Sequence, residues 1–265
     1  MATVRIEFAG KSFAFDNSNE TDLVASQVSN GSYEAPLPLL MMATLLRVEG
    51  CFVDVGANTG IYVVMAGILT VDRNIYAFEP LPAVARIARG NIEANALAQR
   101  VTLHEVALSD AVGTASLHLP DPGHGLVETS ASLERDFKVA HTIIEVPMKT
   151  LDDFSIKETV GVIKVDIEGH EYAFLRGAVK TIKRDRPLIF AEVVGPARKA
   201  SIGAFLHDAD YVDFRLRPDM AIHDGEVVFD NLAWNHAFVP RERIEKFKEA
   251  CDSCGILMVR RYMLR

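Results

Sequence analysis

The chain has 265 residues, of which 49% are hydrophobic, and its formal net charge is −8. This length allows one large α/β domain or two small ones with a substantial core. The acidic balance argues against nucleic acid as a partner, because the short basic spots at 184–186 and 260–261 are interpreted as solvated surface. We therefore expect no nucleic-acid partner, while a homo-oligomer remains open.

The three cysteines and the apolar runs bear on the compartment. Cys51 begins an apolar strand and three thiols cannot all pair, so we expect free cysteines in a reducing compartment. Cys251 and Cys254 form a single Cys-x-x-Cys without further zinc ligands, which favours an ordinary helix end. The N-terminus does not resemble a signal peptide, and the longest apolar run, 35–46, is too short to cross a bilayer. The resulting expectation is a cytoplasmic protein with no membrane partner.

The first hundred residues alternate between strand and helix patterns. Alternating apolar residues and a Gly-Lys turn predict an N-terminal hairpin over 3–15, and residues 17–31 are predicted as polar loop or short helix. Apolar spacing then predicts a helix at 38–48, a strand at 51–55, a helix at 59–69, a strand at 74–78, a helix at 81–96 and a strand at 101–107. Asn58 or Thr59 is available to cap the second of these helices.

The segment 110–150 interrupts this alternation. Two alternating stretches, 114–119 and 142–148, are separated by glycines and prolines, which predicts an inserted hairpin or lid with a mobile tip near 123–125. The later pattern predicts a strand at 162–165, a helix at 172–183, a strand at 188–194, a helix at 197–208 and antiparallel strands at 211–216 and 231–240. The order predicts one doubly wound α/β domain over 49–265, preceded by a hairpin and covering helix over 1–48.

A glycine-bearing turn follows the strand at 51–55. Gly56 and Gly60 allow the backbone to come close to a ligand, and Glu79, at the end of the next strand, suits a pair of ribose hydroxyls. Asp54 would repel a pyrophosphate and favours a cofactor with a cationic end, such as S-adenosylmethionine. A nicotinamide-dependent dehydrogenase is the alternative enzyme, and the Gly-x-x-x-Gly spacing disfavours it.

A second cluster of ionisable residues follows the strand at 162–165. Asp166, Glu168, His170 and Glu171 lie within six residues at the carboxyl end of that strand, where open α/β sheets bind their ligands. Charges at such an edge must be hydrated, paired or functional. The alternative is that Asp166 or Glu168 only stabilises the N-terminus of the next helix.

Five ordered motifs together resemble the FkbM family of S-adenosylmethionine-dependent methyltransferases. The motifs are Val-Asp-Val-Gly-Ala-Asn-Thr-Gly at 53–60, Phe-Glu-Pro at 78–80, Ala-Leu-Ser-Asp at 107–110, Thr-Leu-Asp-Asp at 150–153 and Lys-Val-Asp-Ile-Glu-Gly-His-Glu at 164–171. The resemblance covers about 33–195. It implies a class I, Rossmann-like methyltransferase fold with a mostly parallel sheet, helices on both faces and an antiparallel C-terminal edge. It also implies O-methylation of a hydroxyl on a sugar or natural-product-type small molecule.

The resemblance assigns roles to individual positions. The residues expected to bind the cofactor are Asp54, Gly56, Ala57, Asn58, Gly60, Glu79, Pro80, Ala107 and Asp166. Among them, Glu79 is expected to hold the ribose, the region 105–107 to flank the adenine, and Asp166 to line the methyl-transfer end. A non-catalytic S-adenosylmethionine-binding protein is the alternative from a different functional class.

Two routes could activate the acceptor hydroxyl. His170 is the first candidate for a general base, because imidazole titrates near neutrality, and Asp166 and Glu168 are the carboxylates expected beside it. The alternative is that His170 is a surface histidine or only supports residues that touch the ligands. Asp166 and Glu192, which end adjacent strands, could instead offer carboxylates to Mg²⁺.

Acceptor specificity is expected from the parts outside the motifs. Tyr33 and Glu34 precede the covering helix, the insert supplies a lid, and His223, Trp234 and His236 come from the C-terminal strands. Trp234 is interpreted as a core residue, and a platform on which a sugar stacks is the alternative.

Overall fold

The structure is a computed structural model that describes residues 3–16, 24–120, 131–134, 140–195 and 197–260. One large sheet runs through its centre. Its strands are β3 (Cys51–Val55), β4 (Ile75–Phe78), β5 (Val101–His104), β9 (Val160–Val165), β10 (Leu188–Glu192), β11 (Tyr211–Arg217), β12 (Met220–His223), β13 (Asn235–Pro240) and β14 (Leu257–Arg260).

The sheet confirms the predicted doubly wound architecture. Its strand order is β14-β12-β11-β13-β10-β9-β3-β4-β5. The five strands from β10 to β5 are parallel, and β13 pairs antiparallel with both β10 and β11. The chain moves outward from β3 in one direction and later from β9 in the other, so the strand order reverses between these two strands.

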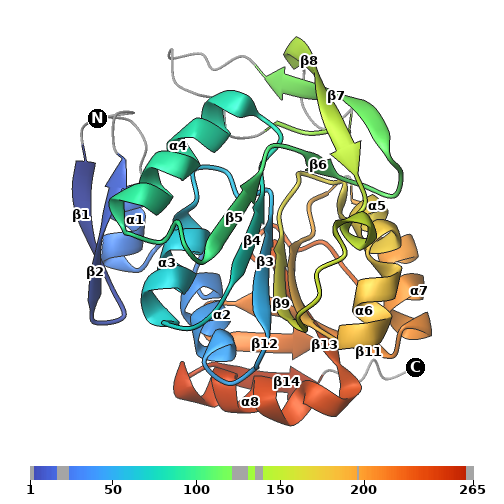
Figure 1. Cartoon of the computed structure of the whole chain (residues 1–265). Coiled ribbons are helices and arrows are strands. Elements are labelled where there is room, and N and C mark those ends of the chain that lie inside the picture. The colour runs from blue at the N-terminus through green and yellow to red at the C-terminus, as the bar shows by residue number, and fades with distance from the viewer. Residues whose placement is uncertain (1–2, 17–23, 121–130, 135–139, 196, 261–265) are drawn as a thin grey trace.

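Helices cover both faces of the sheet (Figure 1). The helices of the described residues are α1 (Val24–Asn30), α2 (Leu37–Leu45), α3 (Ile61–Leu69), α4 (Pro82–Ala94), α5 (Glu171–Gly177), α6 (Val179–Asp185), α7 (Lys199–Asp208) and α8 (Ile244–Ser253), of which α1 packs on the N-terminal hairpin. Successive strand side chains point to opposite faces, so the sheet has two cores. Phe52 belongs to the core that includes residues of α2, α3 and α8, whereas the next residue, Val53, belongs to the core that includes residues of α5, α6 and α7.

The N-terminal hairpin and the insert lie outside the central sheet. The hairpin strands β1 (Thr3–Phe8) and β2 (Lys11–Asp16) pair antiparallel, and Asn91 of α4 and Asn95, which follows its last residue, bind the backbone of β2 through their side-chain amides. The insert forms a second small sheet from β6 (Ala107–Leu108), β7 (Gly113–Pro120) and β8 (Ala140–Lys149), above the carboxyl ends of the large sheet (Figure 1). Its predicted tip at 123–125 lies outside the described residues.

Three predicted elements differ from the structure. The strand expected over 101–107 ends at His104, because residues 107–108 pair with β8 instead of β4. The helix expected over 172–183 divides at Ala178, because Asp152 binds the N–H groups of Lys180 and Thr181 and so begins a separate helix, α6. The strand expected over 231–240 begins only at Asn235.

The cap expected for α3 is also wrong. Gly60, with φ of 85°, is the residue at the N-cap and offers no side chain, while Oδ1 of Asn58 accepts the N–H of Thr59. Strands β12 and β14 were not predicted. The three cysteines are free, as expected, and Cys251 and Cys254 lie at the end of α8.

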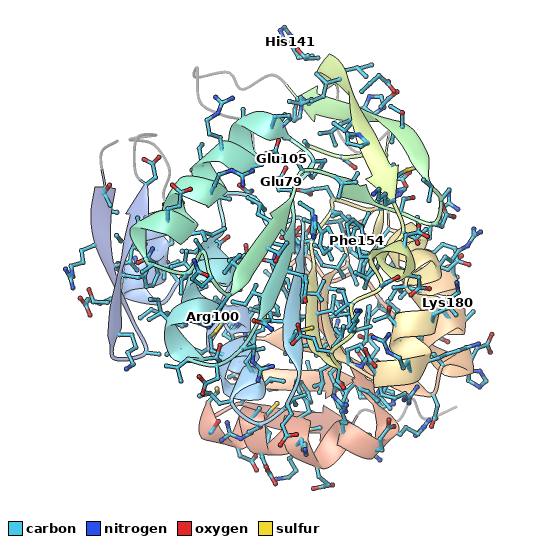
Figure 2. All side chains as sticks on the ribbon, viewed as in Figure 1. Glu79, Arg100, Glu105, His141, Phe154 and Lys180 are labelled. Carbon is cyan, nitrogen blue, oxygen red and sulfur yellow. The ribbon has the colours of Figure 1, made fainter. Side chains whose placement is uncertain are left out.

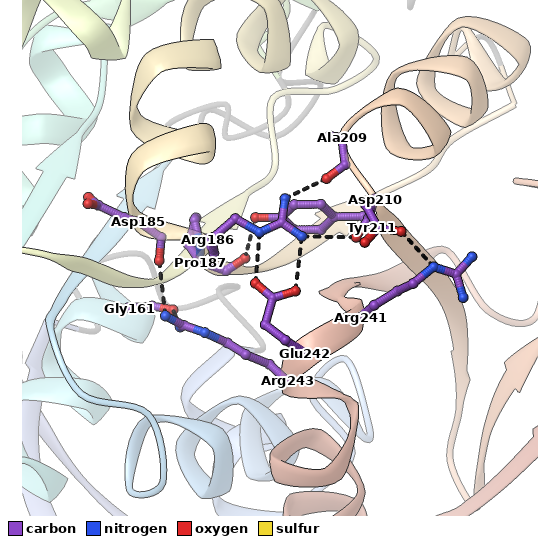
Figure 3. Close-up of polar contacts among 10 residues, drawn as sticks. All are labelled: Gly161, Asp185, Arg186, Pro187, Ala209, Asp210, Tyr211, Arg241, Glu242 and Arg243. Atoms are coloured by element: carbon purple, nitrogen blue, oxygen red, sulfur yellow. Dashed lines mark hydrogen bonds and ion pairs between the residues drawn. The ribbon is translucent and has the colours of Figure 1, made fainter.

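Arg186 is a structural residue rather than a solvated basic residue. It forms two hydrogen bonds with Glu242, at 2.8 and 3.1 Å, and its guanidinium lies 4.7 Å from the ring centre of Tyr211 (Figure 3). It also donates to the carbonyls of Ala209 and Asp210. These contacts join the end of α6 to β11 and to the 3₁₀ turn Arg241–Arg243, which begins the C-terminal helix. None of the helices in the described ranges is both long and apolar enough to span a bilayer.

Candidate functional site

A pocket of about 310 Å³ opens at the carboxyl ends of β3, β4 and β9. This is the point where the strand order reverses, and open α/β sheets bind ligands there. The acid-rich turn after β9 and Glu192 at the end of β10 form one side of the pocket. Leu117, Ala131 and Leu133 of the insert contribute an apolar wall.

Gly56 brings the turn after β3 into contact with the turn after β9. The N–H of Asp166 donates to the carbonyl of Val55 at 3.0 Å. A Cβ atom on Gly56 would lie only 1.9 Å from the carbonyl oxygen of Asp166, and the φ of 74° is itself a conformation that glycine tolerates best. The absence of a side chain at this position is therefore required for the two strand ends to meet.

Glu79 is fixed in orientation at the end of β4. Its two carboxylate oxygens accept the N–H groups of Asn58 and Leu81, each at 2.9 Å, and the side chain lines the pocket. Burial raises the pKa of Glu79 to about 7, although these two hydrogen bonds act in the opposite direction. Figure 2 shows Glu79 and Glu105 at the same upper end of the sheet, above β4 and β5.

A buried lysine lies among the acids at the floor of the pocket. Lys164 Nζ lies 3.2 Å from Asp166 Oδ2, and the parallel pairing of β3 with β9 places Asp54 beside Lys164. Burial acts to lower the pKa of Lys164, but the charges of Asp166, Asp54 and Glu34 outweigh it and raise that pKa. Lys164 therefore stays charged.

Asp54 is fully buried, and neither of its carboxylate oxygens has a hydrogen-bond partner among the described residues. Burial raises its pKa to about 6. Burying an ionised carboxylate without a hydrogen-bond partner costs free energy. A positively charged group beside Asp54 would reduce that cost.

Glu34 reaches the same floor from the segment before α2. Its Oε2 accepts the hydroxyl of Tyr62 at 2.6 Å, and the Lys164 ammonium lies 4.7 Å from the centre of the Tyr62 ring. Burial raises the pKa of Glu34. Tyr62 belongs to the first turn of α3, so the helix that follows the glycine turn positions both charged groups.

Three carboxylates meet at the mouth of the pocket. One oxygen of each of Asp166, Glu168 and Glu192 lies within 4.8 Å of the other two. Burial, followed by repulsion from Asp166 and Glu168, raises the pKa of Glu192 to about 10, and its Oε2 has no partner among the described residues. Oxygen atoms in this arrangement suit a hard divalent cation. The predicted pair Asp166 and Glu192 is thus joined by Glu168.

Glu171 holds the acid-rich turn in shape. Its Oε1 accepts the N–H groups of Ile167 and Gly169, at 3.3 and 3.1 Å, while Oε2 is buried without a partner among the described residues. The side chain has no exposed surface, and burial raises its pKa to about 8. Glu171 therefore supports the turn through its hydrogen bonds to two backbone N–H groups.

His170 lines the pocket, but both of its ring nitrogens have protein partners. Nδ1 lies 2.7 Å from Glu134 Oε1, and Nε2 lies 2.8 Å from Ser109 Oγ. Ser132 Oγ also donates to the carbonyl of Glu168 at 2.8 Å. His170 thus joins the insert to the acid-rich turn. To take a proton from an acceptor, the ring would first have to release one of its two partners.

Most of the predicted site residues line this one pocket: Gly56, Ala57, Asn58, Glu79, Pro80, Ala107, Asp166, Glu168, His170 and Glu192. Two do not. Asp54 lies beneath the floor, and Gly60 packs against Ala88 on α4. The sequence reasoning missed Tyr62 and Lys164, although Lys164 is the one charge within the otherwise apolar strand Val160–Val165.

Some of the residues proposed for acceptor specificity line the pocket and others do not. Tyr33 and Glu34 line the pocket. His236 is fully buried, with Nδ1 2.8 Å from Asp213 Oδ1, and does not line it. Trp234 is 51% exposed, so its interpretation as a core residue is wrong.

Substitution of Gly56 by alanine is expected to lower the free energy of unfolding for two reasons. The positive φ is unfavourable for alanine, and the added methyl group has no space. In Gly56→Ala, the new methyl group collides with the Asp166 carbonyl, whereas Gly225→Ala, at a φ of 86°, meets nothing within 4 Å. We expect Gly225→Ala to cost about 1–2 kcal/mol and Gly56→Ala about 1–3 kcal/mol more, measured by urea unfolding. Equal costs for the two variants would contradict the close contact.

The buried Glu171 is expected to give stability a pH dependence. Its pKa rises from 4.5 to about 8 on folding, so between these values the folded state holds a proton that the unfolded chain releases. This group therefore lowers stability as the pH increases from 4.5 to 8. Relative to wild type, Glu171→Gln should gain stability over that window, by at most about 1.4 kcal/mol per pH unit in urea unfolding. The exposed Glu7→Gln controls for loss of one charge, and a constant difference between Glu171→Gln and wild type would rule out the effect.

Comparison with known proteins places the chain in a family. Residues 54–212, more than half of the chain, match the methyltransferase FkbM domain. The fold is similar to that of the methyltransferase FkbM from Methylobacillus flagellatus KT, with 17% identity and a TM-score of 0.50. That match covers 72% of this chain and 43% of the other, so the chain spans less than half of that protein's length.

Two further solved structures match with lower TM-scores. The precorrin-6y C5,15-methyltransferase from Geobacter metallireducens GS-15 is 16% identical over 76% of this chain and 86% of its own, with a TM-score of 0.44. TYW2 from M. jannaschii, solved in complex with AdoMet, is 13% identical over 89% and 84%, with a TM-score of 0.47. No curated protein sequence matches the chain. With its class I, Rossmann-like methyltransferase fold, the chain belongs to the FkbM methyltransferase family.

Proposed function

We propose that this chain is an S-adenosylmethionine-dependent O-methyltransferase that acts on a hydroxyl group of a sugar or natural-product-type small molecule. The observation that carries the proposal is the charge of the pocket. Glu34, Glu79, Asp166, Glu168 and Glu192 line it, and Lys164 is the one lysine or arginine among the described lining residues. Such a pocket favours a ligand with positive charge.

The residues present fit this cofactor. Gly56 leaves its backbone free of a side chain beside Asp166, and Glu79 directs oriented carboxylate oxygens to the end of β4, where a ribose would lie. When bound, the cofactor supplies an electrophilic methyl group on a sulfonium. The protein's part is then mainly to align acceptor and methyl group, which can contribute on the order of 7–11 kcal/mol.

The acceptor is expected beside Asp166, Glu168 and Glu192. Leu117, Ala131 and Leu133 of the insert would cover its apolar parts and exclude water. A carboxylate there can take the hydroxyl proton, and Asp166 is oriented for this by Lys164. His170 remains a candidate base, and in the present geometry it orients the turn through Glu134 and Ser109.

Binding and transfer can be tested separately. Isothermal titration should show one site for S-adenosylmethionine and for S-adenosylhomocysteine, and absence of binding to both would reject the proposal. Asp166→Asn and His170→Gln should keep measurable cofactor binding. Methyl transfer, followed as S-adenosylhomocysteine released with a panel of hydroxylated sugars, should fall at least about a hundredfold for the variant that removes the base.

The same panel separates the rival functions. Binding without release of product on any acceptor would favour a non-catalytic S-adenosylmethionine-binding protein. Fluorescence of a reduced nicotinamide cofactor on mixing would instead favour a dehydrogenase. Unchanged transfer in both variants would remove both residues from the reaction.

A divalent cation is a second feature that the carboxylate cluster favours. Asp166, Glu168 and Glu192 would hold Mg²⁺, and when bound the ion would lower the pKa of the acceptor hydroxyl. Treatment with chelator should then abolish transfer, and added Mg²⁺ should restore it, with Glu192→Gln needing severalfold more Mg²⁺ than wild type. Full activity after chelation would eliminate the metal.

A further inference from the structure

We infer that Glu34, held by Tyr62 beside Asp54, binds the α-ammonium group of the cofactor's methionine part. The inference rests on the proposed function and adds a residue from outside the glycine turn to the cofactor site. It also gives the segment before α2 a role in binding rather than only in covering the pocket.

The order of the strands fixes which end of the cofactor lies near Glu34. Glu79 ends β4 and would hold the ribose, and Ala107, after β5, lies beyond it. The methionine part must therefore extend in the opposite direction, past β3 toward β9. Glu34 and Lys164 line the pocket on that side, which is where the parallel pairing places Asp54 beside Lys164.

The charges on that side do not balance without a ligand. Glu34, Asp54 and Asp166 surround a single ammonium group, that of Lys164, whose nearest acid is Asp166 at 3.2 Å. The fully buried Asp54 has no hydrogen-bond partner among the described residues, and the charges of Lys164, Asp166 and Glu34 all act on it. A second ammonium group at this position would supply the positive charge that is missing.

Tyr62 holds Glu34 in position for such a ligand. Its hydroxyl donates to Glu34 Oε2 at 2.6 Å, and its ring lies against the Lys164 ammonium. Tyr33, the residue before Glu34, also hydrogen-bonds the Glu34 carboxylate. The side chain of Tyr62 is buried in the first turn of α3 and so has little freedom. The carboxylate is therefore oriented before the cofactor arrives, which limits the entropy lost on binding.

Three ligands that differ only in the amino-acid part test the inference by calorimetry. S-adenosylhomocysteine carries both the ammonium and the carboxylate, S-adenosyl-3-thiopropylamine keeps only the ammonium, and 5′-methylthioadenosine has neither. Glu34→Gln should weaken the first two about tenfold or more and change the third by less than about twofold. Tyr62→Phe should follow the same pattern with a smaller loss.

Glu158→Gln is the matched control. Glu158 also accepts a tyrosine hydroxyl, from Tyr76 at 2.8 Å, and it is half-buried like Glu34, but it lies before β9 at the opposite end of the sheet. Glu158→Gln should leave the affinity for all three ligands unchanged. Loss of a Glu–Tyr hydrogen bond elsewhere in the protein would then be shown not to weaken binding.

The outcomes separate this inference from the proposed function. If wild type binds none of the three ligands, the cofactor assignment itself fails. If wild type binds them but Glu34→Gln weakens all three equally, or weakens none, the cofactor assignment stands and Glu34 is not the ammonium ligand. Selective loss of the two amine-bearing ligands establishes it.

Discussion

The contact between Gly56 and the carbonyl of Asp166 is the constraint on which the site depends. Because the Asp166 N–H also binds Val55, the ends of β3 and β9 are joined at the point where the strand order reverses. Each of these strand ends carries an acid, and their parallel register places Asp54 beside Lys164. A backbone contact without a side chain thus determines where the charged groups of the pocket meet.

The close contact between the two strand ends gathers acidic side chains in the pocket and so affects their pKa values. Buried acids outnumber the cations around them, and the cost of ionising them raises the pKa values of Asp54 and Glu79 to about 6 and 7. Protons can compensate the missing positive charge in the free protein. A cationic ligand would replace those protons, so ligand binding and the ionisation of the floor are thermodynamically linked. The acids whose burial lowers the stability of the fold are the same groups that favour a sulfonium or an ammonium.

Elements that depend on local sequence patterns could be predicted from the sequence. Features that depend on contacts between residues distant in the chain could not. The strand Cys51–Val55 and the residues of the glycine turn follow from apolar runs and short spacing, so they could be predicted. Tyr62 lies in an almost entirely apolar helix, and its link to Glu34 spans 28 residues, so no local pattern marks it. The division of the predicted helix 172–183 depends on Asp152, which is again distant in the chain. Trp234 is exposed, although a large aromatic side chain favours a place in the core.

Several hydrogen bonds join the insert to the acid-rich turn, which bears on how transfer could be controlled. His170 binds Glu134 on one side and Ser109 on the other, and Ser132 binds the carbonyl of Glu168. The wall formed by Leu133 is therefore fixed to the same turn that presents the carboxylates. Any shift of this turn that brought Glu168 toward an acceptor would move the wall with it. In the proposed reaction, enclosure of the acceptor and placement of the carboxylates would therefore be coupled, through His170 and Ser132 together.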